Sequence, residues 1–229
     1  KTAFCLRMCA LLEEQASLHC EPRREGAAVQ VDGLVFVGAI AHAPHAALLR
    51  AAGRDDAADL LEVHTTAGAA HTAAMQSLGA RHAAFAPAVR LVKRWLSSHL
   101  LSGVVSPQLI ELVAAAAVAS PAEPPAASAI RGFLRILSLL ASHRFDAEPL
   151  VVGVAAPLTA DVRAAAAQAF EAARAAPDGD GDGGGGGALV WVATEAEPQG
   201  TRWAAGAALS PPLLKRLQTL AAASVARLR

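Results

Sequence analysis

The sequence contains no tyrosine, only three cysteines and two methionines, and no excess of charge of either sign. Lysine plus arginine and aspartate plus glutamate number 20 each, so no overall basic field can hold nucleic acid through counterion release. Any contact with nucleic acid must therefore come from a local group of cations. The longest apolar run, LIELVAAAAVA, is shorter than a bilayer-spanning helix and carries Glu111. We expect neither a signal peptide nor a membrane-spanning segment.

The three cysteines, Cys5, Cys9 and Cys20, lie close together near the start of the chain. This number and spacing suit neither a disulfide framework nor a four-ligand zinc site, even if His19 is added to the set. We therefore expect reduced cysteines that act as small apolar residues on a helix in an intracellular protein. The chain also starts at a lysine in the middle of a pattern, which indicates a fragment of a longer protein.

What is present is mostly helical patterning. Hydrophobic residues make up 54% of the 229 positions, and many of them are alanine, a strong helix former. Helices are predicted over 2–18, 44–61, 66–78, 90–101, 107–119 and 130–141, within LTADVRAAAAQAFEAAR, and within SPPLLKRLQTLAAASVARL. In the second of these regions Gly53 separates two short helices, and Asp55 or Asp56 is placed to cap the latter.

The clearest β signal is AAVQVDGLVFVGAI, which predicts two strands joined by a tight turn at Asp32-Gly33. The segment EPRREG just before it is interpreted as a polar break. PLVVGV and LVWVATE are short candidate strands. We predict that Ser106 and Thr159 cap the helices that follow them, and that one side of the 130–141 helix is buried. The sequence thus predicts an α+β protein that is predominantly α-helical. The buried side comprises Phe133, Leu134, Ile136, Leu137 and Leu140.

A glycine-rich run, PDGDGDGGGGGA, imitates a calcium-binding loop. Asp178, Asp180, Asp182 and Gly183 occupy positions 1, 3, 5 and 6 of that pattern. Position 12, which requires a bidentate glutamate, is Leu189, and a strand follows at once. These departures favour a flexible surface insertion, and no metal site is predicted.

Other candidate groups also have simpler interpretations. His64 and His71 lie two helical turns apart, but no carboxylate between them completes a site, so partly buried or capping histidines are predicted. Ser97 and Ser98 adjoin His99, yet neighbours on a helix do not face one another. No nucleophile elbow, phosphate loop or dinucleotide fingerprint is present, so no catalytic residue and no cofactor are predicted. The remaining acidic cluster is interpreted as a solvated helix start: Asp55, Asp56 and Asp59.

The segment RLVKRWLSSHLLSG (90–103) separates into two faces at about 100° per residue. The apolar face carries Leu91, Val92, Trp95, Leu96, His99 and Leu100, and Trp95 is predicted to lie in the core. The opposite face carries Ser97, Ser98 and three cations, called here the basic stripe: Arg90, Lys93 and Arg94. A stripe of this kind is either a solvated face or a surface for phosphate contacts. Further candidate phosphate ligands are Arg131 and Arg135, four residues apart on a neighbouring helix.

Two long blocks, AFAPAVRLVKRWLSSHLLSGVVSPQLIELVAAAAV and GFLRILSLLASHRFDAEPLVV, resemble the nucleolar RNA-associated protein (Nrap) family, a component of the small-subunit processome. LVWVAT, Trp203 and LLKRLQTLAAAS extend the resemblance, which runs from about residue 64 onward. The upstream segment VDGLVFVGAI resembles the strand pair of the family. The order of several blocks, rather than any single one, makes the resemblance specific.

The resemblance implies two modules. Residues 1–63 would form the C-terminal part of a nucleotidyltransferase-like domain. Residues 64–229 would form a helical domain like that of poly(A) polymerases and oligoadenylate synthetases, with a flexible glycine-rich insertion at 177–187. The implied role is a nucleolar, RNA-binding scaffold in ribosome biogenesis, with pre-ribosomal RNA and other processome proteins as partners. In active relatives a lysine near the nucleotide phosphates matches Lys93.

Several features depart from the active relatives. Their catalytic carboxylates lie on strands of the other domain after a glycine-serine turn, which this chain lacks, and Asp32 in the hairpin turn does not replace them. The family has an arginine-bearing strand after the hairpin phenylalanine, where this chain reads VFVGAI. The glycine-rich insertion is also foreign to the family. The resemblance therefore implies a scaffold derived from an enzyme. The alternative is a template-independent nucleotidyltransferase whose carboxylates lie upstream of this chain.

Overall fold

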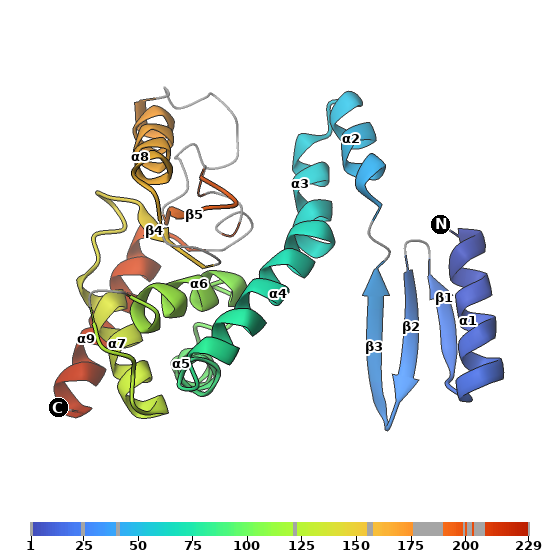
Figure 1. Cartoon of the computed structure of the whole chain (residues 1–229), viewed down its shortest axis with the longest axis horizontal. Coiled ribbons are helices and arrows are strands. Elements are labelled where there is room, and N and C mark those ends of the chain that lie inside the picture. The colour runs from blue at the N-terminus through green and yellow to red at the C-terminus, as the bar shows by residue number, and fades with distance from the viewer. Residues whose placement is uncertain are drawn as a thin grey trace. The chain divides into compact units, whose positions relative to one another are not determined.

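The computed structural model describes residues 2–23, 26–39, 42–120, 123–154, 158–175, 190–198, 200, 203 and 209–228 (Figure 1). The protein is α+β and mainly helical, as predicted. It divides into two compact units, Lys1–Ala70 and His71–Arg229. The assignment of 1–63 and 64–229 to two enzyme-derived modules stays a prediction. The glycine-rich insertion at 177–187, with its calcium-loop pattern, lies outside the described residues.

The first unit begins with α1 (Thr2–Ala16), which packs on a three-stranded antiparallel sheet. The order of the strands is β1 (Cys20–Arg23), β2 (Gly26–Val31) and β3 (Leu34–Ala39) (Figure 1).

The predicted hairpin is confirmed, because Val31 pairs with Leu34 around Asp32 and Gly33, whose φ angles are 50° and 80°. Left-handed angles at both turn residues are those that an Asp-Gly pair tolerates.

Strand β1 was not predicted, since its residues were interpreted as a polar break. It is a short edge strand that pairs with β2, with Cys20 opposite Val29. Its last three positions are exposed, so polar residues and Pro22 are tolerated there. A strand with only one buried position has no alternating apolar pattern, and this explains why the sequence did not reveal it.

The expectation of three reduced cysteines is wrong for two of them. Cys9 and Cys20 form a disulfide, with their Cα atoms 5.0 Å apart, whereas Cys5 is free and buried. The chain turns after α1 so that β1 runs back along the helix, which brings these two side chains together. They share an apolar cluster with Ala27. His19 is exposed and lies near two glutamates rather than joining the cysteines.

The two helices that follow are separated near Gly53, as predicted. Their bounds are α2 (Ala43–Ala51) and α3 (Asp55–His64). The predicted aspartate cap is wrong: Arg54 occupies the N-cap position of α3 and forms no side-chain cap bond. Arg50 instead binds Asp59 at 2.7 Å and Glu62 at 2.6 Å, so Asp59 is paired rather than merely solvated.

The helix α4 (Thr66–Arg81) runs through Gly79, where the sequence predicted its end. It begins in the first unit and ends in the second. A glycine inside a helix costs roughly 1 kcal/mol relative to alanine and does not by itself stop the helix.

The second unit is built around α7 (Ala129–Ser142), which contacts three other helices. These are α5 (Phe85–Ser98), α6 (Pro107–Val118) and α9 (Pro211–Leu228). On α7 Ile136, Leu137 and Leu140 are buried as predicted, while Phe133 and Leu134 are only partly buried.

Helix capping in this unit follows the sequence. Ser106 accepts a bond from the Leu109 amide at the start of α6, as predicted. Ser128 does the same for the amide of Arg131 at the start of α7.

A small parallel sheet completes the second unit. Strands β4 (Leu150–Val152) and β5 (Val192–Thr194) pair with Leu150 opposite Val192, and α8 (Ala160–Ala175) lies between them in the chain. Phe170 of α8 packs against Trp191 beside β5, with ring centroids 5.8 Å apart. Thr159 accepts a bond from the Val162 amide and caps α8, as predicted.

Helix α5 carries most of the segment 90–103. Trp95 is buried as predicted, and its indole N–H donates to Ser224 of α9 at 3.0 Å. The helix ends at Ser98, earlier than predicted, and Leu100 has a φ of 58°. Leu100 is 82% exposed, so its predicted place on the apolar side of the helix is wrong, because the helix ends before this position.

Candidate functional site

Within the second unit, one side chain each from α4, α5 and α6 and the ring of Trp203 form a polar cluster. Glu111 of α6 accepts from Lys93 of α5 through Oε1, and its Oε2 lies 2.7 Å from Nε2 of His71 on α4. The His71 ring also lies 4.8 Å, centroid to centroid, from that of Trp203. Both carboxylate oxygens of Glu111 are therefore engaged. We call these residues the Glu111 cluster: His71, Lys93, Glu111 and Trp203.

The electrostatics of this cluster favour the charged carboxylate. Burial by itself raises the pKa of Glu111, but the hydrogen bonds from His71 and Lys93 outweigh it and hold that pKa below its usual range. The negative charge of Glu111 offsets the positive charge of Lys93 at contact distance. The placement of Lys93 on the solvent face is thus only partly correct, because its half-buried ammonium group is paired.

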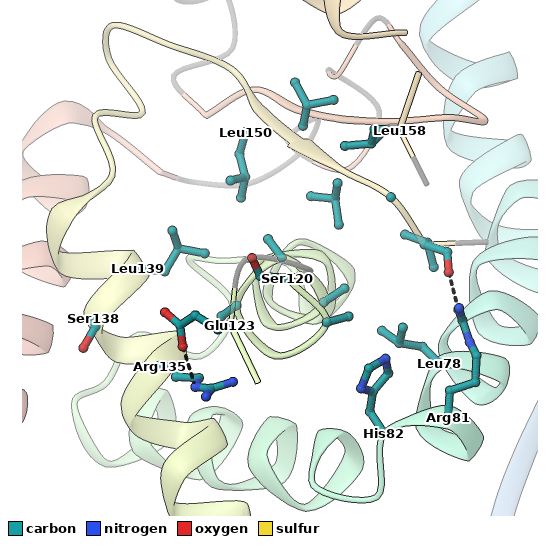
Figure 2. A pocket seen from close by; sticks show the side chains of 18 of the residues that line it. Leu78, Arg81, His82, Ser120, Glu123, Arg135, Ser138, Leu139, Leu150 and Leu158 are labelled. Carbon is teal, nitrogen blue, oxygen red and sulfur yellow. Dashed lines mark hydrogen bonds and ion pairs between the residues drawn. The ribbon is translucent and has the colours of Figure 1, made fainter. Parts of the chain in front are cut away.

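A second feature is a pocket of about 930 Å³ (Figure 2). It is lined by the C-terminal ends of α4 and α6, by one side of α7, by β4 and by the start of α8. We call it the arginine pocket, because four arginines line it together with His82 and Glu123: Arg81, Arg131, Arg135 and Arg163. Figure 2 shows Glu123 and Arg135 on one side and Arg81 with His82 on another.

Two of these arginines have partners within the pocket. Arg81 donates to the carbonyl oxygen of Val154 at 2.5 Å, and Arg135 Nε lies 2.8 Å from a carboxylate oxygen of Glu123. The Nη1 atom of Arg135 is buried without a hydrogen-bond partner. Arg131 and Arg163 are exposed, and the described part of the chain provides no ion pair to either. Two cations therefore remain available to a ligand.

The structure separates the predicted RNA-binding residues into two groups. Arg131 and Arg135 line the arginine pocket, whereas no residue of the basic stripe does. Arg90 and Arg94 are exposed on α5. Contact of any of these residues with RNA stays a prediction. Sequence reasoning missed Arg81 and Arg163, since they come from distant helices and no local pattern marks them.

The remaining candidates do not form a reactive site. His64 is exposed at the end of α3, contrary to expectation, and His71 is buried on α4, so the two lie on different helices. Ser98 Oγ lies 3.3 Å from His99 Nδ1, closer than expected from neighbouring positions, because the helix ends there. Both groups also lie 2.8 Å from the carbonyl oxygen of Trp95.

Within the described ranges, no three His, Cys, Asp or Glu residues are grouped so as to hold a metal ion. None of the helices described is long and apolar enough to cross a membrane.

Residues 82–229 match the family described as Nrap protein PAP/OAS1-like domain 5. The chain belongs to the Nrap family. It is 34% identical to human Nucleolar protein 6 over 186 residues, which cover 76% of this chain and 16% of that protein. It is also 30% identical to Nucleolar protein 6 of Xenopus laevis over 165 residues, 67% of this chain and 14% of the relative. The match to U3 small nucleolar RNA-associated protein 22 of Schizosaccharomyces pombe is 35% over 105 residues, 45% of this chain and 10% of the relative.

These matches confirm the predicted family and, with it, the nucleolar location and the link to ribosome biogenesis. The chain spans only about one sixth or less of the length of these curated relatives. The relatives carry the names of nucleolar proteins rather than of enzymes.

Proposed function

We propose that this chain is part of a non-catalytic RNA-binding scaffold that acts in pre-ribosomal RNA processing for the small ribosomal subunit. Pre-ribosomal RNA and other processome proteins are its partners. The proposal rests on one observation about the basic stripe. Lys93 is paired with Glu111, whereas Arg90 and Arg94 remain exposed. The names of the relatives, which refer to the nucleolus and to the U3 small nucleolar RNA, support this role.

The pairing of Lys93 argues against a nucleotide-binding role. A triphosphate would have to displace Glu111 from Lys93 and would then face the carboxylate that His71 still binds. Removing one partner from a partly buried ion pair leaves an uncompensated charge, which is costly. The lysine that matches a phosphate ligand of active relatives instead joins two helices of this protein.

The geometry of the two free arginines supports phosphate contacts. Arg90 and Arg94 are four residues apart and therefore neighbours on one face of α5, about 5–6 Å apart at their Cβ atoms. Guanidinium groups at this spacing suit adjacent phosphate oxygens, and such contacts position a backbone without reading its sequence. The expected binding is consequently electrostatic, dependent on salt and weakly selective for sequence.

The test of the RNA-binding part replaces both arginines. Arg90→Ala with Arg94→Ala should weaken binding of a structured pre-ribosomal RNA fragment, and should lower the slope of log affinity against log salt by about one to two. A matched control, Arg144→Ala with Arg227→Ala, removes the same charge from other exposed positions of the second unit. Equal affinities and slopes for the two double variants would contradict the assignment to α5.

The non-catalytic part is tested on the full-length protein with an RNA primer, labelled nucleoside triphosphates and Mg²⁺. We expect no primer extension. Extension that is lost in a Lys93→Ala variant would instead support a template-independent nucleotidyltransferase, whose metal-binding carboxylates would then lie outside this chain.

A further inference from the structure

We propose that the arginine pocket binds an extended acidic segment of a partner protein, in which acidic side chains alternate with aliphatic ones. The proposal concerns a different surface from the basic stripe and does not depend on RNA binding by α5. Charge, the nature of the apolar wall and an open strand edge each support it.

The charge of the pocket is unbalanced. Four arginines and His82 line it, and Glu123 is the only carboxylate in the described lining. Arg81 and Arg135 are engaged, which leaves Arg131 from α7 and Arg163 from α8 as exposed cations on two different elements. A planar guanidinium group binds a carboxylate through two parallel hydrogen bonds. Two such groups on separate helices therefore suit two acidic side chains of one ligand.

The rest of the wall is aliphatic. Figure 2 shows Leu78 of α4, Leu139 of α7 and Leu150 of β4 around the pocket. Alanines of α6 are also part of the lining. In the described lining there is neither phenylalanine nor tryptophan. Proteins that hold single-stranded RNA stack successive bases on aromatic rings or guanidinium planes, and His82 is the one aromatic ring in this described lining. An aliphatic wall beside free arginines fits a peptide with apolar and acidic side chains better than it fits RNA. The large aliphatic residues are Leu78, Leu134, Leu139, Leu150, Val151, Val152, Val154 and Leu158.

Strand β4 offers backbone groups for such a peptide. Within the described structure it pairs with β5 on one edge only. The Leu150 amide donates to Trp191 at 2.8 Å on that paired edge. Hydrogen-bonding groups alternate between the two edges of a strand, so the amide and carbonyl of Val151 face the open one. Since Val151 lines the pocket, an added strand would run along it.

Strand addition also explains the required pattern of the ligand. Successive side chains of an extended segment point to opposite faces. A segment paired with β4 would direct every second side chain toward one wall of the pocket and the remaining side chains away from that wall. The pocket volume of about 930 Å³ lies near the upper end of the range of about 300–1,000 Å³ that is typical of small-ligand sites.

The experiment uses the 229-residue chain and a fluorescein-labelled hexapeptide with alternating glutamate and valine. A matched peptide has glutamine in place of each glutamate. We expect the acidic peptide to bind at least about tenfold more tightly by fluorescence anisotropy, as two charge-assisted contacts would produce. Equal binding of the two peptides, or no binding of the acidic one, overturns the proposal.

A double variant, Arg131→Glu with Arg163→Glu, tests the site on the protein. Both positions lie in the first turns of helices, where glutamate is favourable, so the variant should fold. We expect it to lower affinity for the acidic peptide at least about tenfold. The control, Arg90→Glu with Arg94→Glu, makes the same charge change on α5 and should leave peptide binding unchanged. Equal affinities of the two double variants would place the peptide elsewhere and overturn the assignment.

Two further probes complete the test. Methylation of alternate backbone nitrogens, tested for each of the two alternating sets, should abolish binding for the set that pairs with β4, and retained affinity of both methylated peptides would overturn strand addition. A single-stranded uridine oligonucleotide should not displace the peptide. Displacement by the oligonucleotide, with loss of RNA binding in the Arg131→Glu, Arg163→Glu variant, would make the pocket an RNA site and overturn the proposal. Failure of the α5 proposal would appear separately, as unchanged RNA binding in the Arg90 and Arg94 variants.

Discussion

Lys93 of α5 and Glu111 of α6 form an ion pair within the helical unit, and His71 of α4 binds the other oxygen of the same carboxylate. Three consecutive helices are thereby joined through one glutamate. The α6 segment otherwise carries only apolar residues and a glutamine, so Glu111 is its one charged contact with neighbouring helices. Glu111 therefore has a structural role. Its negative charge offsets that of Lys93, which was a candidate phosphate ligand on the sequence alone.

Replacement of Glu111 tests this role. Glu111→Gln should destabilise the protein by about 1–3 kcal/mol near neutral pH, because Lys93 and His71 lose a charged acceptor. The folded pKa of Glu111 is held below its ordinary value of 4.5, so its contribution is present above that pH and is lost as the pH falls toward the lowered value. Urea unfolding of both proteins should show a difference that shrinks in acid. Glu171→Gln, an exposed control on α8, should change stability by less than about 0.5 kcal/mol. A difference that is independent of pH would contradict the assignment.

His143 at the end of α7 should make stability fall in mild acid. Burial lowers its pKa below the ordinary value of 6.5, and the Glu148 carboxylate opposes this only in part. Its Nε2 atom is buried without a partner, so protonation would leave a buried donor unpaired. A group with a lowered folded pKa stabilises the protein above its unfolded pKa, and stability is lost as the pH falls below 6.5.

The measurement is the slope of unfolding free energy against pH on either side of pH 6.5. His143→Gln removes the titrating group and should flatten the slope between about pH 5 and pH 7. Its stability at about pH 8 serves as the reference for any packing change. An unaltered slope in the variant would show that other groups cause the pH dependence.

Gly132 allows the close approach of α7 to α5. A Cβ atom built at Gly132 would lie 2.8 Å from the Cβ of the fully buried Ala88. Gly132→Ala should therefore destabilise by about 1–3 kcal/mol, although alanine favours a helix. At Gly79 in α4 the nearest atom to such a Cβ is 3.9 Å away, on Phe85. Gly79→Ala should instead stabilise by about 0.5–1 kcal/mol, and thermal or urea unfolding that gave both variants the same sign would refute this account.

Because β3 is an exposed edge strand, we expect the 229-residue chain to self-associate when it is studied alone. All six positions of β3 are exposed, and it pairs with β2 along one edge only in the described sheet. Val35 and Val37, 62% and 67% exposed, share one face of this strand. Lysine at both positions should reduce association in light scattering, because charge blocks edge-to-edge pairing.

The control for β3 places the same two charges on helices. Leu48→Lys with Leu60→Lys changes two exposed leucines of α2 and α3. A similar drop in association for this variant would show that net charge, rather than the strand edge, is responsible.

Local features of this protein were predictable from its sequence. Asp32 and Gly33 specify the hairpin because few other pairs adopt left-handed angles at both turn positions. Ser106 and Thr159 specify helix starts because each hydroxyl reaches an amide only three residues away. The burial of Trp95 follows from helical spacing alone. The α+β class and the family resemblance rest on the order of such local segments.

The tertiary structure decided the rest, because it depends on side chains that are distant in sequence. The pairing of Glu111 with Lys93 and His71 arises only when three helices pack together. The Cys9–Cys20 disulfide requires β1 to run back along α1. The arginine pocket likewise forms where the ends of several helices meet. Periodicity and capping act over a few residues, so the sequence indicated which faces are buried but not which partners meet there.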